Sequence, residues 1–576
     1  MGDVGPSVPA HLRRFVVEQD YSQYTAVDQA VWRFVLLQTH ARLVDTAHPA
    51  YREGLAATCI SVDRIPSVAE MNDKLSRFGW GAVCVDGFIP PRAFQEFQAN
   101  GILPIAGEMR TREHLVYTPA PDIIHEAAGH APILPDPVYA EFLRRIGDLG
   151  RKAFTLPEED RVYRAFYALS EAMEDPAVAP SELGRIETEL AAAVAGASEA
   201  SEAARLSRLY WWTAEYGLVG LVDDYKLYGA GLLSSLGESH SCHAPAVAKR
   251  PLDEGCMNVP YDITRSQPQL FVARSFEALH DILDRVSGGL AFEVGGEVAL
   301  SRAIRSRDLA SVHFSSGASA IVVLAQAGPS LSSPAWLTFE GPGAFAWDGS
   351  ISRTDAVTWE DSFCVVAGRL ASGALVERLS EDDIGRLRDK ARDRIAFDFA
   401  SGARVEGSIV RTVRHADGRL THVDLGNVRI ALPGSPTRHL ARHSLVAAGD
   451  PVSARPGAID PAFHPIASRP RVSVPRPRER PESERRLTSL YERAERAHCT
   501  GDDGMEGEFG RVLRELDRDY PDEWLLRWNI LESLLKVRSD GTTARALRGA
   551  LERLEVGFEH RQPIASGLRY LAGLGA

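Results

Sequence analysis

The spacing of apolar residues changes along this chain, and the changes exclude a single uniform architecture. Up to about residue 285 apolar residues recur at helical intervals, as in "YTAVDQAVWRFVLLQTHARL". From about 286 to 465, short apolar runs such as "SAIVVLAQAG" and "LTHVDLGNVRIAL" are separated by Gly, Ser and Asp, which is typical of β-strands and turns. With 576 residues the chain is also too long for one hydrophobic core, so we expect a multidomain protein.

Four segments follow from these patterns. Residues 1–285 are expected to be mainly α-helical, with short strands at "GAVCVDGFI" and "PQLFVARSF". Residues 286–465 are expected to form a β-rich domain that begins with "LAFEVGGEVAL" and contains a helix near 379–393. The proline- and arginine-rich stretch "SRPRVSVPRPRERPESERR" predicts an exposed linker over 466–482. The helical spacing that returns after it predicts a C-terminal α-helical module over 483–576.

The net charge and the cysteine content limit which binding partners and which cellular compartment are expected. A formal net charge of −13 argues against nucleic acid or an anionic membrane as the main partner. The six cysteines lie far apart without a C-x-x-C pair, so neither a disulfide scaffold nor a zinc ribbon is indicated. The sequence opens without an apolar leader and has no run of about 18 apolar residues. We therefore expect no membrane span and a cytoplasmic location.

A pair of histidines in "YTPAPDIIHEAAGHAPIL" suggests a metal site. His125 and His130 are five residues apart, whereas the zinc-protease pattern H-E-x-x-H places its two ligands four apart. On an ideal helix the second imidazole is turned by roughly 140° from the first. Both reach one ion only if the helix ends nearby, and Gly129 followed by "APILPDP" predicts such an end. Two neutral imidazoles suit iron, zinc or copper.

The third ligand decides which metal such a pair binds. Glu215, in "RLYWWTAEYGLVG", is an acid within an aromatic and otherwise apolar helix. A buried carboxylate needs a cation or metal to offset its desolvation. Two histidines and one carboxylate with open positions indicate non-haem Fe(II). From the residues alone, a salt-bridged acid at a helix edge is an equally good interpretation of Glu215.

Three motifs in a fixed order make the interpretation more specific. These are "YTPAPDIIHEAAGHAPIL", "LYWWTAEYGLVG" and "YGAGLLSSLGE", the last spanning Tyr228–Glu238. Over about residues 80–290 they resemble the pterin-dependent aromatic amino acid hydroxylases, which act on phenylalanine, tyrosine or tryptophan. The resemblance implies a mainly α catalytic domain over 1–285. It also implies ring hydroxylation of a free aromatic amino acid, with Fe(2+), a tetrahydropterin such as tetrahydrobiopterin, and O2 as co-substrate.

The resemblance assigns roles around the metal. His125, His130 and Glu215 are the implied iron ligands. Glu126 is implied to act catalytically beside the open iron positions and the pterin. Tyr210 is implied to lie close to the iron and the pterin as a second catalytic residue.

The resemblance also assigns a pterin loop and a substrate pocket. Gly87 begins the loop, and Phe94 is implied to stack on the pterin ring. Arg110 is implied to bind the substrate carboxylate as a two-pronged fork, oriented by Asp122. The remaining implied substrate-binding residues are Thr118, Pro121, Trp211, Tyr216, Gly231, Ser234 and Ile263. Considered one at a time, these residues have simpler interpretations. Phe94 could be a core residue of an amphipathic helix, Arg110 a surface arginine, and Trp211 a packing residue.

Ile263 bears on which amino acid is hydroxylated. It occupies a position that resembles a specificity site, apolar in phenylalanine hydroxylases and acidic in tyrosine hydroxylases. An apolar residue favours phenylalanine, because a buried phenol hydroxyl would lack a partner. We therefore expect L-phenylalanine to be converted to L-tyrosine, with tryptophan or tyrosine hydroxylation as alternatives. Ile263 equally fits an ordinary core position.

Two departures from the family pattern leave other readings open. His130 and Glu215 are 85 residues apart, about double the family's usual separation, and we expect a helical insertion at about 150–200. The chain beyond residue 290 has no counterpart in the well-known members. Residues 286–576 are expected to offer a surface for a protein partner or for self-association. The rival functions are a zinc hydrolase with Glu126 as general base, and a non-catalytic scaffold.

Overall fold

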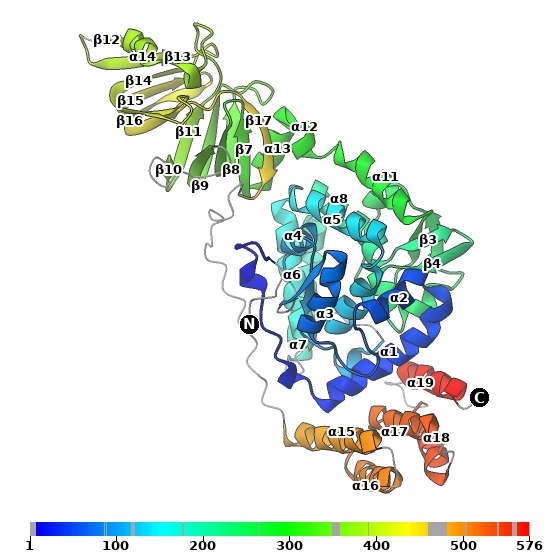
Figure 1. Ribbon diagram of the computed structural model, residues 1–576. Helices are drawn as coiled ribbons and strands as arrows, with labels where there is room; N and C mark the ends of the chain where they lie inside the picture. Colours follow the sequence, from blue (N-terminus) through cyan, green and yellow to red (C-terminus); the bar gives the residue numbers. More distant parts are fainter. Residues whose placement is uncertain are drawn as a thin grey trace.

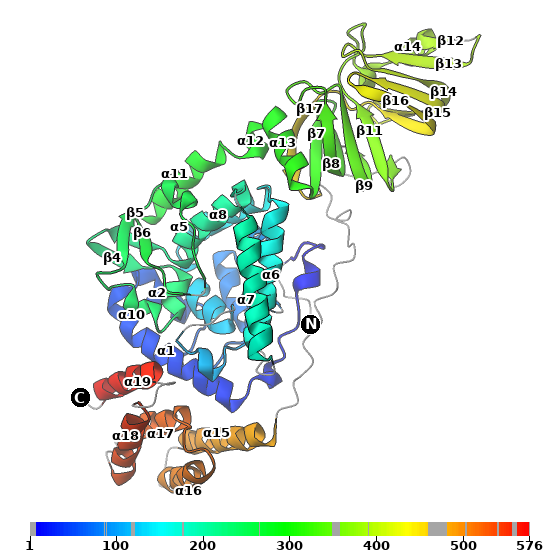
Figure 2. The ribbon, with the colours of Figure 1, turned by 180° about the vertical axis from the view of Figure 1, so that it is seen from behind.

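The molecule has a helical body, β-sheets that project from one end of it, and C-terminal helices at the opposite end (Figure 1; Figure 2). Helix α11 (Phe276–Ser287) leads from the body toward the sheets. The structure is a computed structural model, and it describes residues 7–85, 87, 89–116, 121–174, 178–197, 199–263, 265–347, 357–389, 391–458, 481–500, 504–537, 541–555 and 561–574.

The helical body is built from segments whose apolar faces meet in one core. Its first helix begins with a capping box, in which Thr25 and Asp28 each accept the other's backbone N–H, and it buries Trp32 and Phe34. The helices before α11 are α1 (Ala26–Thr46), α2 (Pro49–Ala57), α3 (Val68–Leu75), α4 (Pro91–Ala99), α5 (Pro137–Arg151), α6 (Pro157–Glu174), α7 (Pro180–Gly196), α8 (Glu202–Tyr210), α9 (Ala230–Ser234) and α10 (Glu238–Ser241).

Two small sheets complete the helical body, and they confirm the two short strands expected there. Strands β1 (Gly81–Val85) and β2 (Ile102–Ala106) pair in parallel. The second sheet has the order β4-β3-β6-β5, in which β3 is antiparallel to β4 and parallel to β6. Its strands are β3 (Leu218–Leu221), β4 (Asp224–Leu227), β5 (Ala248–Pro251) and β6 (Gln269–Ala273).

The projecting part consists of two antiparallel sheets, as the short apolar runs predicted. One has the order β10-β9-β8-β7-β17, with β11 also paired to β9, and the other has the order β12-β13-β14-β15-β16. The strands are β7 (Leu309–Phe314), β8 (Ala318–Gly328), β9 (Trp336–Trp347), β10 (Thr358–Trp359), β11 (Ser362–Val366), β12 (Arg388–Asp389), β13 (Arg394–Asp398), β14 (Arg404–Arg414), β15 (Leu420–Leu432), β16 (Ser435–Val446) and β17 (Pro451–Pro456). The helix expected near 379–393 is the shorter α14 (Glu381–Leu387).

The stretch "LAFEVGGEVAL" is helical, so its assignment as the first β-run is wrong. It forms α12 (Ala291–Val294) and the start of α13 (Gly296–Ser306), which meet at Gly295 with φ of +69°. The buried side chains Leu300 and Ala303 lie on one face of α13, and that face packs against β8 and β17. The glycine pair therefore separates two short helices that cover the sheet.

The C-terminal helices return to the helical body. They contact α1 and belong to the same hydrophobic cluster as the body's core. They are α15 (Glu482–Thr500), α16 (Gly504–Asp519), α17 (Leu525–Lys536), α18 (Thr542–Glu555) and α19 (Arg561–Leu574). The predicted linker over 466–482 lies outside the described residues up to residue 480. In the described part of the chain, every helix is too short or too polar to cross a bilayer.

Candidate metal centre

The two histidines lie in a π-helix, Ile124–His130. Hydrogen bonds in a π-helix run between residues five apart, so side chains at that spacing point in the same direction. The π-helix leads directly into a 3-10 turn, Ala131–Ile133. The π-helix ends at His130 and the 3-10 turn ends at Ile133, so the helical segment does end near Gly129, as predicted. A wider helical turn, and not a break, aligns His125 with His130.

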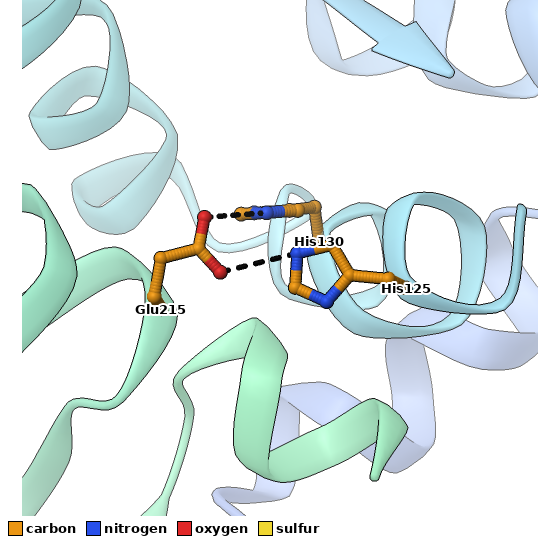
Figure 3. Close-up of side chains that lie close together, drawn as sticks. All are labelled: His125, His130 and Glu215. Carbon is orange, nitrogen blue, oxygen red and sulfur yellow. Dashed lines mark ion pairs between the residues drawn. The ribbon is translucent and has the colours of Figure 1, made fainter. Parts of the chain in front are cut away.

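Glu215 reaches the histidines from a second π-helix, Trp211–Glu215, which extends α8. Its Oε2 lies 3.1 Å from Nε2 of His125, and its Oε1 lies 3.2 Å from Nε2 of His130. Figure 3 shows the carboxylate facing both rings. The structure thus brings the three expected ligands together, with ligand atoms within 4.8 Å of one another.

The electrostatics of this cluster favour a bound cation. Burial by itself would raise the pKa of the Glu215 carboxyl, but the facing His130 and His125 rings lower it below its ordinary value. Burial opposes a proton on His125, but the nearby carboxylates, chiefly that of Glu215, together outweigh burial and raise the pKa of His125 to about 9. Within the described part of the chain, Nδ1 of the buried His130 has no hydrogen-bond partner, and its Nε2 faces the Glu215 carboxylate. A buried carboxylate that faces two imidazole nitrogens fits a divalent ion such as iron or zinc.

Neighbouring groups orient the ring of His125. Its Nδ1 lies 3.1 Å from Oγ of Ser234, and its backbone N–H donates to Asp122 over 3.0 Å. Such contacts to the second imidazole nitrogen fix the direction of a metal-binding ring. Helix α9, which carries Ser234, approaches the π-helix so closely that a Cβ on Gly129 would lie 2.7 Å from the carbonyl oxygen of Ala230. Glycine at position 129 is what permits this approach.

Arg110 and Asp122 form a buried two-pronged ion pair beside the metal-ligand cluster. The Arg110 Nε and Nη2 donate to the two carboxylate oxygens of Asp122 over 2.7 and 2.8 Å. Burial by itself would raise the pKa of Asp122, but the Arg110 guanidinium lowers it below its ordinary value. Because Asp122 also accepts the backbone N–H of His125, it connects the arginine to the histidine π-helix.

An aromatic and polar group borders the cluster on another side. The ring centroid of Phe94, in α4, lies 6.3 Å from that of His130 and 6.0 Å from that of Tyr210. Gln98 Nε2 donates to the Tyr210 hydroxyl over 2.7 Å, a contact that was not expected. Its signal was a polar residue one turn after Phe94, on the same face of a buried helix. Glu126 is buried too, and burial, partly offset by His125 and His130, raises its pKa to about 7.

Trp211 and Tyr216 belong to a second aromatic group. Trp211 stacks on Tyr261 with ring centroids 4.3 Å apart, and its Nε1 donates to Gln267 over 3.3 Å. The Tyr216 hydroxyl donates to the buried carboxylate of Glu238 over 2.7 Å. Tyr261, Gln267 and Glu238 were not expected, since only the distant contacts formed by folding distinguish them from other polar and aromatic residues.

The other expected residues take varied positions. Gly87 has φ of +56°, which favours glycine, and its N–H donates to Glu108 over 2.8 Å. Gly231 lies against Tyr216, whose ring would be 2.8 Å from an added Cβ. Pro121 is half-buried next to Asp122, and Ile263 is half-buried in a turn before β6. Thr118 lies outside the described residues.

The helical body of this chain is similar to known proteins. The profile of the family described as "Biopterin-dependent aromatic amino acid hydroxylase" matches residues 17–163 and 174–291. The match is interrupted within α6, in the stretch where the helical insertion was expected. "Phenylalanine-4-hydroxylase" of Mesorhizobium japonicum is 30% identical over 271 residues, which cover 46% of this chain and 82% of the relative. The enzyme of the same name from Chromobacterium violaceum is 31% identical over 270 residues, covering 46% and 76%.

Solved structures of the Chromobacterium violaceum enzyme are also similar to this chain. One, described as holding iron(III) and oxidised 7,8-dihydrobiopterin, is 29% identical with a TM-score of 0.38 and covers 48% of this chain and 86% of that one. The fold and the site define a mainly helical protein in which two histidines and one carboxylate lie close enough together to hold one metal ion. On the strength of the sequence matches, the chain belongs to the biopterin-dependent aromatic amino acid hydroxylase family.

Proposed function

We propose that this chain hydroxylates L-phenylalanine to L-tyrosine with Fe(2+), a tetrahydropterin and O2. The convergence of His125, His130 and Glu215 in one buried cluster is the observation that carries the proposal. The relatives at about 30% identity are named phenylalanine hydroxylases, which supports phenylalanine over tryptophan or tyrosine. Family membership counts against a zinc hydrolase. The presence of His125, His130 and Glu215 in one cluster counts against a non-catalytic scaffold.

In this proposal the side chains of the protein hold the iron and the pterin and orient the substrate. The three ligands would hold the iron, Phe94 and Gly87 would border the pterin, and these cofactors when bound supply the activation of O2. Glu126 is buried next to His125, where its carboxyl group would hold or release a proton beside the metal. Tyr210 would lie at the same edge, held by Gln98.

Arg110 is proposed to bind the substrate carboxylate. A guanidinium has five N–H donors, and Asp122 occupies only the edge formed by Nε and Nη2. The edge formed by Nη1 and Nη2 is left for a second carboxylate. Asp122 therefore orients the arginine without preventing a two-pronged contact with an amino acid.

The rest of the pocket is proposed to enclose the ring. Trp211, Tyr216 and Pro121 would form its walls, and Thr118, Gly231 and Ser234 would border the amino-acid backbone. Ser234 faces His125 as well, so it would connect the pocket to the metal. Ile263 would exclude a phenol hydroxyl by offering it no hydrogen-bond partner.

A product assay tests the proposed function. The full chain is loaded anaerobically with Fe(II), then supplied with a tetrahydropterin, O2 and one aromatic amino acid at a time, and products are identified by mass. We expect tyrosine from phenylalanine, with little product from tryptophan or tyrosine. Phenylalanine left unchanged, or peptide hydrolysis by a zinc-loaded protein, would refute the proposal.

Further proposals concern the domain boundaries, the partners and the cellular compartment. We propose domain boundaries at 285, 465 and 482, supported by the two antiparallel sheets that lie wholly within 309–456. Residues 286–576 are proposed to offer a surface for a protein partner or for self-association. The net charge of −13 supports the absence of a nucleic-acid partner. Five free cysteines among the described residues support a reducing compartment such as the cytoplasm.

A further inference from the structure

The C-terminal helices are joined to the helical body by a buried aromatic contact. Phe34 of α1 lies with its ring centroid 5.1 Å from Trp524 and 4.7 Å from Trp528, both in edge-to-face arrangements. All three side chains are almost fully buried. Gly567 of α19 completes the contact, since a Cβ there would lie 2.6 Å from Nε1 of Trp528. Such close packing holds α17 and α19 in one position on α1.

A buried carboxylate, Glu523, lies at the edge of this contact, just before α17. Its side chain is 2% exposed. Oε1 accepts the Tyr491 hydroxyl of α15 over 2.7 Å and the backbone N–H of Leu525 over 3.1 Å. Its other oxygen, Oε2, forms an ion pair with Arg112 of the helical body. Glu523 therefore ties two C-terminal helices to one point of the catalytic domain.

That point is the segment that carries Arg110. Arg112 opens a short 3-10 turn, Arg112–His114, two residues after Arg110. On one side the segment is held by Asp122, which accepts both the side chain and the backbone N–H of Arg110. On the other side it is held by Glu523 through Arg112. Because a single turn of 3-10 helix is weakly held by its own hydrogen bonds, these ion pairs define its orientation.

We propose that Glu523 is a positioning residue for the substrate, acting through Arg112 on the Arg110 segment. The substrate part of this inference rests on the proposed function, in which Arg110 binds the amino-acid carboxylate. Its structural part, that Glu523 orders residues 109–116, is independent of which substrate is used. The C-terminal helices would then be a built-in part of the active site, and not only a separate module.

The substitution Glu523→Gln tests the inference. The amide oxygen of glutamine still accepts the Tyr491 hydroxyl and the Leu525 N–H, while the charge that faces Arg112 is lost. The matched control is Glu532→Gln, because Glu532 is equally buried in α17 and pairs with Arg33 of α1 over 3.2 Å, away from Arg110. If Glu523→Gln folds poorly, Arg112→Gln breaks the same ion pair by changing its other partner, whose side chain is 30% exposed.

Two measurements on the full chain are compared. Amide hydrogen exchange of a peptide covering 109–116 should become roughly tenfold faster in Glu523→Gln and Arg112→Gln, and stay unchanged in Glu532→Gln. The KM for phenylalanine should rise by roughly tenfold in the first two variants, with the KM for the pterin unchanged. A loss of kcat without a selective rise in the KM for phenylalanine would indicate a merely structural effect.

The outcomes separate the inference from the proposed function. Unchanged exchange at 109–116 in Glu523→Gln and Arg112→Gln overturns the inference, and so does an equal change in Glu532→Gln. Faster exchange in a chain whose wild type does not hydroxylate phenylalanine supports the positioning contact and refutes the proposed function. Faster exchange with an unchanged KM for phenylalanine overturns the role in substrate positioning.

Discussion

At the scale of single residues, charge balance decides what the buried cluster binds. Glu215 brings a carboxylate into a buried site where it faces the imidazoles of His125 and His130. That carboxylate favours a proton on His125 and helps to raise its pKa to about 9. A divalent ion would balance the carboxylate charge and contact one nitrogen of each ring.

Glu215→Gln should abolish tight iron binding. The amide keeps the shape of the side chain but removes the charge that offsets the metal's own. We expect Fe(II) affinity, measured anaerobically by equilibrium dialysis, to fall by at least about 100-fold. This is more than the loss that is typical when the changed residue contacts a metal ligand but not the metal itself. Glu238→Gln, another buried acid exchanged in the same way, should leave iron affinity nearly unchanged. Similar affinity in the two variants would contradict the ligand assignment.

Glu238 should make the stability of the metal-free protein depend on pH. Burial raises its pKa from 4.5 to about 7 in the folded state. The folded protein then binds more protons than the unfolded chain between these values, so this contribution to stability is present at pH 4.5 and below and is lost as the pH rises through 7. Glu238→Gln removes the effect.

The Glu238 effect is measured as a difference between variants. In urea unfolding, the free energy of unfolding of Glu238→Gln relative to wild type should increase by on the order of 3 kcal/mol between pH 5 and pH 8. Subtracting the two profiles cancels groups that both proteins share. A difference that is flat with pH would show that Glu238 titrates normally.

At the scale of elements, two π-helices create the site. Ile124–His130 and Trp211–Glu215 each replace a regular helical turn at the position of the proposed metal ligands. The wider turn aligns residues five apart and directs the glutamate toward them. Helix α9 then packs against the first π-helix at Gly129 and supplies the contact of Ser234 with His125.

Gly129→Ala should disturb this packing. The added methyl would lie 2.7 Å from the backbone oxygen of Ala230, so α9 must move away. We expect a loss of about 1–3 kcal/mol in unfolding free energy, typical of overpacking, and weaker iron binding. Gly184→Ala in the exposed α7, where nothing lies within 4 Å, should instead be neutral or stabilising by up to about 1 kcal/mol. Thermal unfolding and metal titration distinguish the two.

At the scale of the whole molecule, chain segments that are remote in sequence share one core. The C-terminal helices bury α1, while the sheets of residues 309–456 stand away from the body at its other end (Figure 1; Figure 2). The hydroxylase domain is therefore stabilised by residues beyond the range that the family profile matches. Loss of the C-terminal helices would expose Phe34 and its neighbours on α1.

A double-mutant cycle tests this shared core. Phe34→Ala and Trp528→Ala are each expected to cost about 3–5 kcal/mol. Because their rings are in contact, the double variant should depart from additivity by about 0.5–3 kcal/mol. Pairing Phe34→Ala with Val537→Ala, whose side chain is exposed at 51%, should give additive effects. Additivity in the first pair would contradict the contact between α1 and α17.

Much of the molecule could be anticipated from local patterns. Helical spacing predicted the helical body and the C-terminal helices, and short apolar runs predicted the sheets. The pattern failed at "LAFEVGGEVAL", because a short apolar run with two glycines is compatible with either a strand or two short helices. At the site, motif order identified residues such as Arg110 and Asp122, but not Gln98 or Glu238, whose partners are distant in sequence.

The sequence by itself determined which residues were available for chemistry, because the histidines, the glutamate and the arginine lie in motifs that can be recognised without coordinates. It also determined where helices and strands alternate, since that depends on neighbours within a few residues. Only the tertiary structure decided that a π-turn aligns His125 with His130, and that Glu523 reaches Arg112 from the far end of the chain. Both depend on packing between segments, and local spacing carries no information about such contacts.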